Sequence, residues 1–296
     1  MEPDDRILCF GEILWDVLPD RRLPGGAPMN VALHLKKLDL QVRFVSRVGD
    51  DQWGAELKQY LDILGFSNYW LQRDKEYPTG WAEVDLSDSN NPQYRFPDCA
   101  WDHIELDSDL TGCLHQSDIF VYGSLVARSA KSRQTLMDLL KEENTYKVFD
   151  VNLRKPNYSI DLIESLLGRA DLVKMNAHEL SLLEHWFFKP ADEPDLLRNI
   201  SERFDCPVVT VTHGEEGASM LFQDQYYRCP GYSTRVVDAI GAGDAFLAGL
   251  LKGFLKDFPP RDILSFACAT GACVVSHPGA NPDYTMEDID QLMNRE

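Results

Sequence analysis

Short apolar runs alternate with longer amphipathic stretches along most of the chain. Runs that are apolar throughout are typical of strands covered on both faces, and apolar residues three or four positions apart are typical of helices. The predicted strands are 7–10, 42–48, 118–122, 147–151, 171–175 and 208–211, and the predicted helices are 30–38, 53–64, 132–140, 161–167 and 193–203. This alternation predicts an α/β fold, a doubly wound, mostly parallel sheet with helices on both faces.

The clearest helical pattern begins after Gly243. Its apolar residues fall on one stripe: Leu247, Leu250, Leu251, Phe254, Leu255 and Phe258. That spacing predicts an amphipathic helix with one packed side. The glycine-rich segment directly before it therefore lies at a helix N-terminus.

Two segments depart from this rhythm. Residues 13–23 and 79–95 alternate apolar and polar side chains, as in 81–86. Alternation of period two is typical of strands with one face in water. We therefore predict a single domain over 1–296, with a small β-sheet lid at about 12–24 and 78–97 that projects from the edge of the main sheet.

The net charge of −19 at pH 7 narrows the range of partners. A field of that sign repels nucleic acid and anionic membrane surfaces, so we expect neither as a partner. An anionic substrate would need a metal ion, a helix N-terminus or nearby Lys and Arg side chains. A neutral sugar meets no such barrier.

The seven cysteines and the first residues bear on location. The cysteines are odd in number and scattered, with no C-x-x-C pair, which favours a reducing compartment over a disulfide framework or a zinc site. The acidic first residues lead straight into a predicted strand, and no apolar run approaches membrane-spanning length. We expect a cytoplasmic protein.

The strongest chemical signal is Gly241-Ala242-Gly243-Asp244, at the start of the predicted helix. Small residues there leave backbone N–H groups bare, and the positive end of the helix dipole helps them bind anions such as phosphate. A carboxylate at the same point would repel phosphate. Asp244 therefore suits a general base, which takes the proton from an attacking hydroxyl while the amides hold the developing charge.

This segment alone leaves other interpretations open. A short glycine motif is weak evidence, and a simple helix cap is the plainer alternative for Asp244. A dinucleotide-binding fingerprint fits less well, because Phe246 stands where that motif needs Gly. A phosphate loop of the Walker type is absent, since no G-K-S/T occurs in the sequence.

A second glycine motif, 24–30, also leads into a predicted helix. Gly25 and Gly26 let the backbone approach a ligand closely, and Asn30 offers a donor and an acceptor near the helix start. That combination suits the hydroxyl groups of a sugar. An ordinary turn with an Asn cap is the alternative for this motif alone.

Together, six segments resemble, in the same order, the ribokinase-like (PfkB) carbohydrate kinases. They are 25–32, similar to the N-terminal signature; 48–54, similar to V-G-D-D-x-x-G; 150–154; 176–179; 212–217; and 238–244, similar to the C-terminal signature. The resemblance covers nearly the whole chain. It implies the ribokinase-like fold, an ATP-dependent kinase and a lid that closes over the acceptor and excludes water.

The resemblance also implies roles for single residues. Asp244 would be the catalytic base, beside an anion hole formed by Gly241, Ala242 and Gly243. The residues implied in sugar binding are Asp16, Gly26 and Asn30, together with Arg95 from the lid. Those implied in nucleotide binding are Asn152, Arg154, Asn176, Thr212, Gly214, Gly217, Gly279, Ala280 and Asn281.

The implied cofactors are ATP and Mg²⁺. Asn176 and Glu179 would organise the metal and the phosphates through water, as hard oxygen ligands do. Arg154 would offset phosphate charge, and 279–281 would lie near the adenine. A monovalent cation such as K⁺ and a homodimer through the lid are left open.

Several details are similar to the fructokinase branch of this family. They are Trp15-Asp16, Tyr94-Arg95-Phe96 and Gly123-Ser124-Leu125. Ala239-Ile240 stands where Thr-Thr is commoner in this family. The difference bears on which sugar is bound and does not affect Asp244 as the base. We expect transfer of the γ-phosphoryl group of ATP to fructose, giving fructose 6-phosphate.

Other functions stay open at this point. Ribose, 2-keto-3-deoxygluconate and a nucleoside are alternative acceptors on the same fold. A non-catalytic sugar or nucleotide sensor is an alternative of a different class. Such a sensor would be expected to lose the base or the anion hole, and this sequence keeps both.

Overall fold

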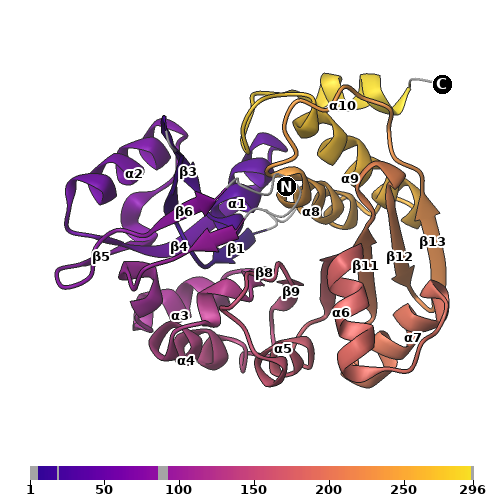
Figure 1. The fold of residues 1–296 in the computed structure, drawn as a ribbon, viewed down its shortest axis with the longest axis horizontal. Coiled ribbons are helices and arrows are strands. Elements are labelled where there is room, and N and C mark those ends of the chain that lie inside the picture. Colours follow the sequence, from indigo (N-terminus) through magenta and orange to yellow (C-terminus); the bar gives the residue numbers. More distant parts are fainter. Residues whose placement is uncertain (1–5, 19, 86–92, 295–296) are drawn as a thin grey trace.

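Nine strands form one sheet through the middle of the molecule (Figure 1). The computed structural model describes residues 6–18, 20–85 and 93–294. From edge to edge the strands are β13 (Gln225–Cys229), β12 (Ala218–Phe222), β11 (Val208–Thr212), β10 (Leu172–Asn176), β9 (Tyr146–Asp150), β8 (Ile119–Gly123), β1 (Arg6–Phe10), β4 (Gln41–Gly49) and β5 (Leu71–Asp74). The strands from β11 to β5 are parallel, and β12 and β13 add an antiparallel edge, so the predicted mostly parallel sheet is confirmed.

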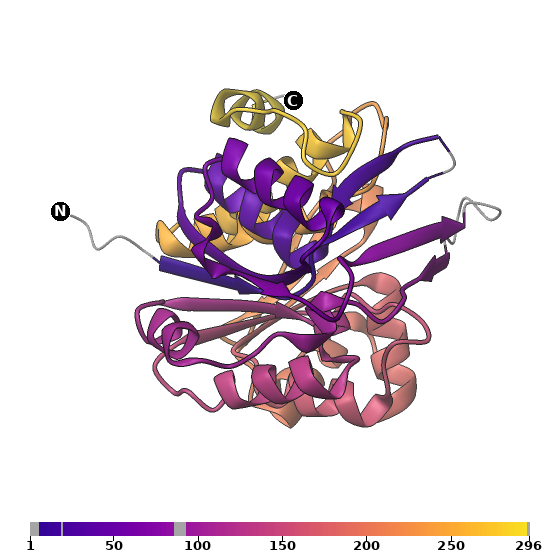
Figure 2. The same cartoon turned by 90° about the vertical axis from the view of Figure 1, so that its left-hand side faces the viewer.

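Helices cover both faces of this sheet, as predicted (Figures 1 and 2). One layer contains α1 (Ala27–Lys37), α2 (Gln52–Ile63), α8 (Ala242–Leu255), α9 (Pro260–Val275) and α10 (Met286–Met293). The other contains α3 (Ser108–His115), α4 (Ala130–Leu139), α5 (Ile160–Leu167), α6 (Ala177–Phe187) and α7 (Glu193–Phe204). Successive strand residues alternate between the layers: Ile7 and Cys9 pack in the first core, and Leu8 and Phe10 in the second.

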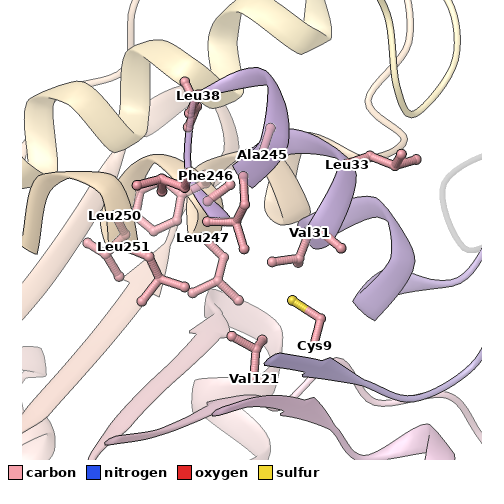
Figure 3. Packing of buried hydrophobic residues seen from close by; sticks show 14 of the residues in the cluster. Cys9, Val31, Leu33, Leu38, Val121, Ala245, Phe246, Leu247, Leu250 and Leu251 are labelled. Atoms are coloured by element: carbon pink, nitrogen blue, oxygen red, sulfur yellow. The ribbon is translucent and has the colours of Figure 1, made fainter. Parts of the chain in front are cut away.

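The helix α8 lies deep in the first layer, between α1 and α9 (Figure 3). All residues from Ala245 to Leu251 are buried. This corrects the expected single packed stripe, because the helix is covered on nearly all sides. It also ends at Leu255, since Asp257 adopts a positive φ of 52°. Phe258 therefore packs from the turn that follows the helix.

A second, four-stranded sheet projects beyond the carboxyl ends of the parallel strands (Figure 2). We call it the small sheet. Its strands lie in the order β3 (Arg22–Gly25), β2 (Leu14–Val17), β6 (Trp81–Asp85) and β7 (Gln93–Arg95). The predicted small β-sheet is thus confirmed, while residues 19 and 86–92 of its segments, and 1–5 and 295–296 of the predicted domain, lie outside the described residues. Within the described ranges, no helix has the length and apolar character that crossing a membrane requires.

Candidate active site

The predicted site residues gather at the carboxyl ends of the parallel strands. Asn152 and Arg154 follow β9, Asn176 ends β10 and Thr212 ends β11. The start of α8 and the small sheet lie at the same end of the molecule (Figures 1 and 2). In open α/β sheets this end is where ligands bind.

The glycine-rich segment forms a sharp turn into α8. Gly241 is the N-cap residue with a φ of 80°, and Asp244 is the third residue of the helix. The alternative of Asp244 as the N-cap residue therefore does not hold. A Cβ atom on Gly241 would lie 2.4 Å from the carbonyl oxygen of Ala280, so only glycine fits there. The N–H of Ala242 makes a long hydrogen bond of 3.4 Å to the carbonyl oxygen of Ala239. As at any helix start, the first N–H groups of α8 lack partners within the helix, and such groups can bind an anion.

Three distant segments meet at the carboxylate of Asp244. The Nδ2 atom of Asn30 donates a hydrogen bond to Oδ2 of Asp244 at 2.8 Å. The Nδ2 atom of Asn281 in turn donates to Oδ1 of Asn30 at 2.7 Å. Asn30 is buried on α1, so this short chain of hydrogen bonds fixes the direction of the Asp244 carboxylate.

The surroundings of Asp244 suit proton transfer near neutral pH. Removal from water and the charge of Asp150 raise the pKa of Asp244 to about 7, while Lys174, Asn30 and Arg154 act against this rise. A carboxylate with such a pKa accepts a proton readily and is still ionised in a large fraction of molecules.

A lysine that the sequence analysis did not identify lies beside the anion hole. Lys174 and Asp150 are paired across β10 and β9, and their side chains are 3.0 Å apart. The Nζ atom of Lys174 lies 3.0 Å from the place where a Cβ atom on Gly243 would be. Burial opposes the charge on Lys174, but the nearby carboxylates of Asp150, Glu179 and Asp244 raise its pKa. The start of α8 therefore has a fixed positive charge next to its free amides.

The small sheet and the second glycine motif form another part of the site. Asp16 lies on β2 beside Gly25, where a Cβ atom would be 2.3 Å from Oδ2 of Asp16. Gly26 has a φ of 117°, and a Cβ atom there would be 2.3 Å from the carbonyl oxygen of Glu12. Burial raises the pKa of Asp16 to about 6, against the lowering effect of Arg154. The two glycines thus let the turn pack directly against the Asp16 carboxylate and the backbone at Glu12.

Arg95 does not lie with these groups. Residues paired across neighbouring strands share one face of a sheet. Arg95 pairs with Glu83, and Glu83 pairs with Val17. Because Val17 follows Asp16 along β2, Arg95 lies on the opposite face of the small sheet from Asp16, and it is exposed to solvent.

Asn176 and Glu179 hold each other at the start of α6. Oδ1 of Asn176 accepts from the N–H of Glu179 at 2.9 Å, and Oε2 of Glu179 accepts from the N–H of Asn176 at 2.8 Å. Oε1 of Glu179 accepts from the N–H of Leu153 at 2.8 Å. Each carboxylate oxygen keeps a second acceptor position, which suits a metal-bound water better than direct ligation. Among the described residues, no cluster of three His, Cys, Asp or Glu side chains forms a metal site.

The remaining predicted nucleotide residues form two groups. Thr212 ends β11, and Gly214 and Gly217 follow it with φ angles of 60° and 92°. Asn152 also has a positive φ, of 37°, beyond the end of β9. These positions place the backbone in tight turns, and the N–H of Gly217 donates to the carbonyl oxygen of Gly214 at 3.2 Å.

The segment 279–281, expected near the adenine, lies close to Asp244. Ala280 packs against Gly241, and its carbonyl oxygen is 3.0 Å from Nε2 of the buried His34. Asn281 reaches Asn30, as described above. The charge of Arg154 acts on both the Asp16 and the Asp244 side of the site. It opposes the rise that burial causes in the pKa of Glu12, Asp16 and Asp244.

Comparison with known proteins agrees with this geometry. Residues 5–286 match the pfkB family carbohydrate kinases. Fructokinase-2 of Oryza sativa subsp. japonica is 30% identical over 93% of this chain and 90% of its own length, and fructokinase of Escherichia coli is 28% identical over 93% and 94%. A crystal structure of fructokinase with bound ATP from Xylella fastidiosa has a TM-score of 0.85 and 25% identity, covering 98% of both chains. The chain therefore belongs to the pfkB family of carbohydrate kinases, and it is a sugar kinase.

Proposed function

We propose that this sugar kinase is a fructokinase, which transfers the γ-phosphoryl group of ATP to the 6-hydroxyl of fructose. The observation that carries the proposal is the Asp244 carboxylate, fixed by Asn30 at 2.8 Å beside the backbone amides of the α8 start. It combines a proton acceptor and an anion site at one place, which phosphoryl transfer to a hydroxyl requires. The names of the relatives support fructose as the acceptor.

In the proposed reaction, Asp244 takes the proton of the sugar hydroxyl. The hydroxyl oxygen forms a bond to the γ-phosphorus, the bond from that phosphorus to the β–γ bridging oxygen breaks, and ADP leaves. The amides of Gly241, Ala242 and Gly243 hold the charge on the transferred group. Lys174 adds a fixed positive charge beside them.

The nucleotide side of the proposal includes Mg²⁺. Asn176 and Glu179 would hold the metal through water, consistent with the acceptor positions that they keep free. When bound, the metal neutralises charge on the phosphates. The proposed nucleotide site is completed by Asn152, Arg154, Thr212, Gly214, Gly217, Gly279, Ala280 and Asn281. Whether K⁺ is required can be tested by measuring ADP release with Na⁺ in place of K⁺.

The acceptor side consists of Asp16, Gly26 and Asn30. A neutral sugar is read through its hydroxyl groups, and Asp16 and Asn30 offer charged and neutral partners for them. We propose that the small sheet acts as the lid over this site and keeps water away from the phosphoryl group. The predicted cytoplasmic location and the homodimer through the small sheet stay predictions.

A coupled assay of ADP release tests the proposal. The panel contains fructose, glucose, ribose, 2-keto-3-deoxygluconate and a nucleoside at equal concentrations. We expect fructose to give the highest kcat/KM, because a site built from hydrogen bonds to hydroxyls discriminates strongly when one partner is missing. A higher value for ribose or for the keto-acid would contradict fructose as the substrate, and no turnover with any acceptor would favour the sensor.

A further inference from the structure

The segment 48–54 resembles a family motif but holds none of the groups assigned to the reaction. The structure shows where its residues point. Gly49 ends β4, Asp51 is the N-cap residue of α2, and Gly54 lies in the first turn of that helix. All three meet one buried side chain, that of Thr79, which lies two residues before the start of β6 in the small sheet.

Asp51 and Thr79 are joined by a compact set of hydrogen bonds. Oδ1 of Asp51 accepts from the Thr79 hydroxyl at 2.7 Å and from the N–H of Gly54 at 2.8 Å. Oδ2 of Asp51 accepts from the N–H of Thr79 at 2.8 Å. The Thr79 hydroxyl accepts from the N–H of Gly49 at 3.0 Å. One carboxylate thus caps α2 and holds the chain that leads into the small sheet.

The two glycines of the segment leave room for this junction. A Cβ atom on Gly49 would lie 2.5 Å from the backbone nitrogen of Thr79. A Cβ atom on Gly54 would lie 2.7 Å from the Thr79 hydroxyl and 2.3 Å from the carbonyl oxygen of Gly49. Side chains at either position would push Thr79 away. The spacing of Gly49, Asp51 and Gly54 is therefore explained by contact with Thr79.

The junction continues directly to the acceptor side of the site. Gly80, the next residue, accepts from the N–H of Trp15 at 3.0 Å, and Trp15 precedes Asp16 on β2. The side chain of Arg22 on β3 lies 4.6 Å from the ring of Trp15 and 4.9 Å from the ring of Trp53 on α2. The small sheet is thus tied to α2 through the backbone at Thr79 and through stacked side chains at Arg22.

The far end of the small sheet is fastened separately. Arg128 donates to the carbonyl oxygens of Phe96 at 3.2 Å and Pro97 at 2.6 Å, just after β7, and to Oδ1 of Asp102 at 2.7 Å. Arg128 therefore holds the end of β7 independently of the hydrogen bonds between Asp51 and Thr79. Loss of the Thr79 contacts should loosen the β6 and β2 end without detaching the sheet.

From these contacts we infer that Asp51 and Thr79 are positioning residues of the acceptor site. They hold β2 at a fixed place relative to the body of the protein, so that Asp16 stays at the right distance from Asp244. This role rests on the proposed function. Without the junction, the sugar should bind less often in the reactive arrangement, while the nucleotide residues after β11 and at 279–281, which do not touch this segment, should be unaffected.

The test compares Thr79→Val with two controls. Thr79→Val keeps the branched shape and removes the hydroxyl, and Thr79→Ser keeps the hydroxyl and removes the methyl group. Asp192→Asn alters a cap of the same kind, since Asp192 caps α7 by accepting from the N–H of Asp195 at 3.0 Å, far from the small sheet. Asp51→Asn is the matching change at the junction.

We expect Thr79→Val and Asp51→Asn to raise the fructose KM about tenfold, with kcat changed by less than about threefold and the Kd for ADP unchanged. Thr79→Ser and Asp192→Asn should keep the wild-type KM. An unchanged KM in Thr79→Val, at a lowered Tm, would mean that the junction is structural only and would overturn the inference.

A second measurement separates this inference from the proposed function. Amide hydrogen exchange of the whole protein, followed by mass spectrometry, reports opening of 12–18 and 79–83 without any substrate. Thr79→Val should exchange faster in both segments, and Asp192→Asn in neither. If the wild-type protein phosphorylates no sugar, the proposed function is wrong. Independently of that result, unchanged exchange in Thr79→Val would show that Asp51 and Thr79 do not hold the small sheet in place.

Discussion

The start of α8 and the small sheet both contribute to the site, but the fold holds them in different ways. From Ala245 on, α8 is embedded between α1 and α9 (Figure 3). The half-buried Asp244 just before this stretch is fixed by the buried Asn30. The small sheet consists of strands of three to five residues that project from the body and are tied to it by a few polar side chains. The core therefore fixes the position of the proposed base, and a few polar contacts fix the groups proposed to orient the acceptor.

This difference predicts that changes in the two regions affect different kinetic constants. Changes at the α8 start should lower kcat, because its groups act on the reacting atoms. Changes in the small sheet should raise the sugar KM, because its groups act on the bound acceptor. Five experiments test this separation.

Removal of the metal should have the largest effect. With a net charge of −19, the protein has few groups to neutralise a triphosphate, and Asn176 and Glu179 fit a hydrated divalent ion. We expect EDTA to abolish ADP release and Mg²⁺ or Mn²⁺ to restore it. Fructose binding, measured by calorimetry without nucleotide, should persist in EDTA. Full turnover in EDTA would contradict the roles of Asn176 and Glu179.

Substitution of the base comes next. Asp244→Asn keeps the shape of the side chain and its contact with Asn30, so folding and the Kd for ADP should stay close to wild type. Turnover should fall by ~10²–10⁴-fold, the usual contribution of a positioned general base. The measurement is kcat with saturating ATP and fructose. Turnover close to that of the wild type would show that the base lies elsewhere.

Loss of the lysine beside the anion hole should lower kcat by about 10²-fold, the typical effect of removing one group that stabilises transition-state charge. The variant is Lys174→Met. Because it also leaves Asp150 buried without its partner, the double variant with Asp150→Asn serves as the control for stability. We expect the double variant to regain Tm but not kcat. Recovery of kcat in the double variant would assign Lys174 a structural role.

A change in the small sheet should raise the KM for the sugar rather than lower kcat. Asp16→Ala removes a carboxylate that lies beside Gly25 in the second glycine motif. We expect the fructose KM to rise about tenfold or more, as when a buried hydrogen bond to a hydroxyl is lost, with the Kd for ADP unchanged. Calorimetry with fructose and with ADP separates the two. Weaker ADP binding at unchanged fructose affinity would place Asp16 on the nucleotide side.

The smallest expected effect is on stability as a function of pH. The pKa of Asp244 is about 7 in the folded protein and about 3.9 in an unfolded chain. The folded state therefore binds the proton more tightly, and this contribution to stability is present in full below about pH 4 and is lost as the pH rises through 7. Asp244→Asn should thus be a few degrees more stable than wild type at pH 8 and equal to it near pH 4. A constant difference in Tm would contradict the raised pKa.

Much of the fold could be predicted from the pattern of apolar residues. The strand 7–10 is apolar throughout, the strand 208–211 is apolar except for Thr210, and both lie inside the main sheet. The edge strand β13 received no prediction, because it contains polar and half-buried residues that resemble a loop. The helix predicted to begin after Gly243 begins at Ala242, two residues earlier. A stripe pattern cannot show that neighbouring helices cover the other side of the helix as well.

The site was predictable where a motif is local and not where it depends on strand register. Asp244 and the glycines before it stand together in the sequence. Lys174 lies in a strand that is otherwise apolar, and only its pairing with Asp150 on β9 reveals a charged pair at the site. Its position two residues before Asn176 was the available signal. Arg95 was assigned to the sugar because alternation alone does not say which face of a strand points inward.

The hydrogen bonds between Asn30, Asp244 and Asn281 also constrain how the protein becomes active during synthesis. They connect residues that are 214 and 251 positions apart in the chain. Domains generally begin to fold from the N-terminal side as the chain emerges. A nascent chain that has exposed α1 and the small sheet still lacks the base, and one that has exposed α8 still lacks the residue that steadies Asn30. The unfinished protein therefore has no complete site of the proposed kind, and it should not hydrolyse ATP there until the chain has left the ribosome beyond residue 281.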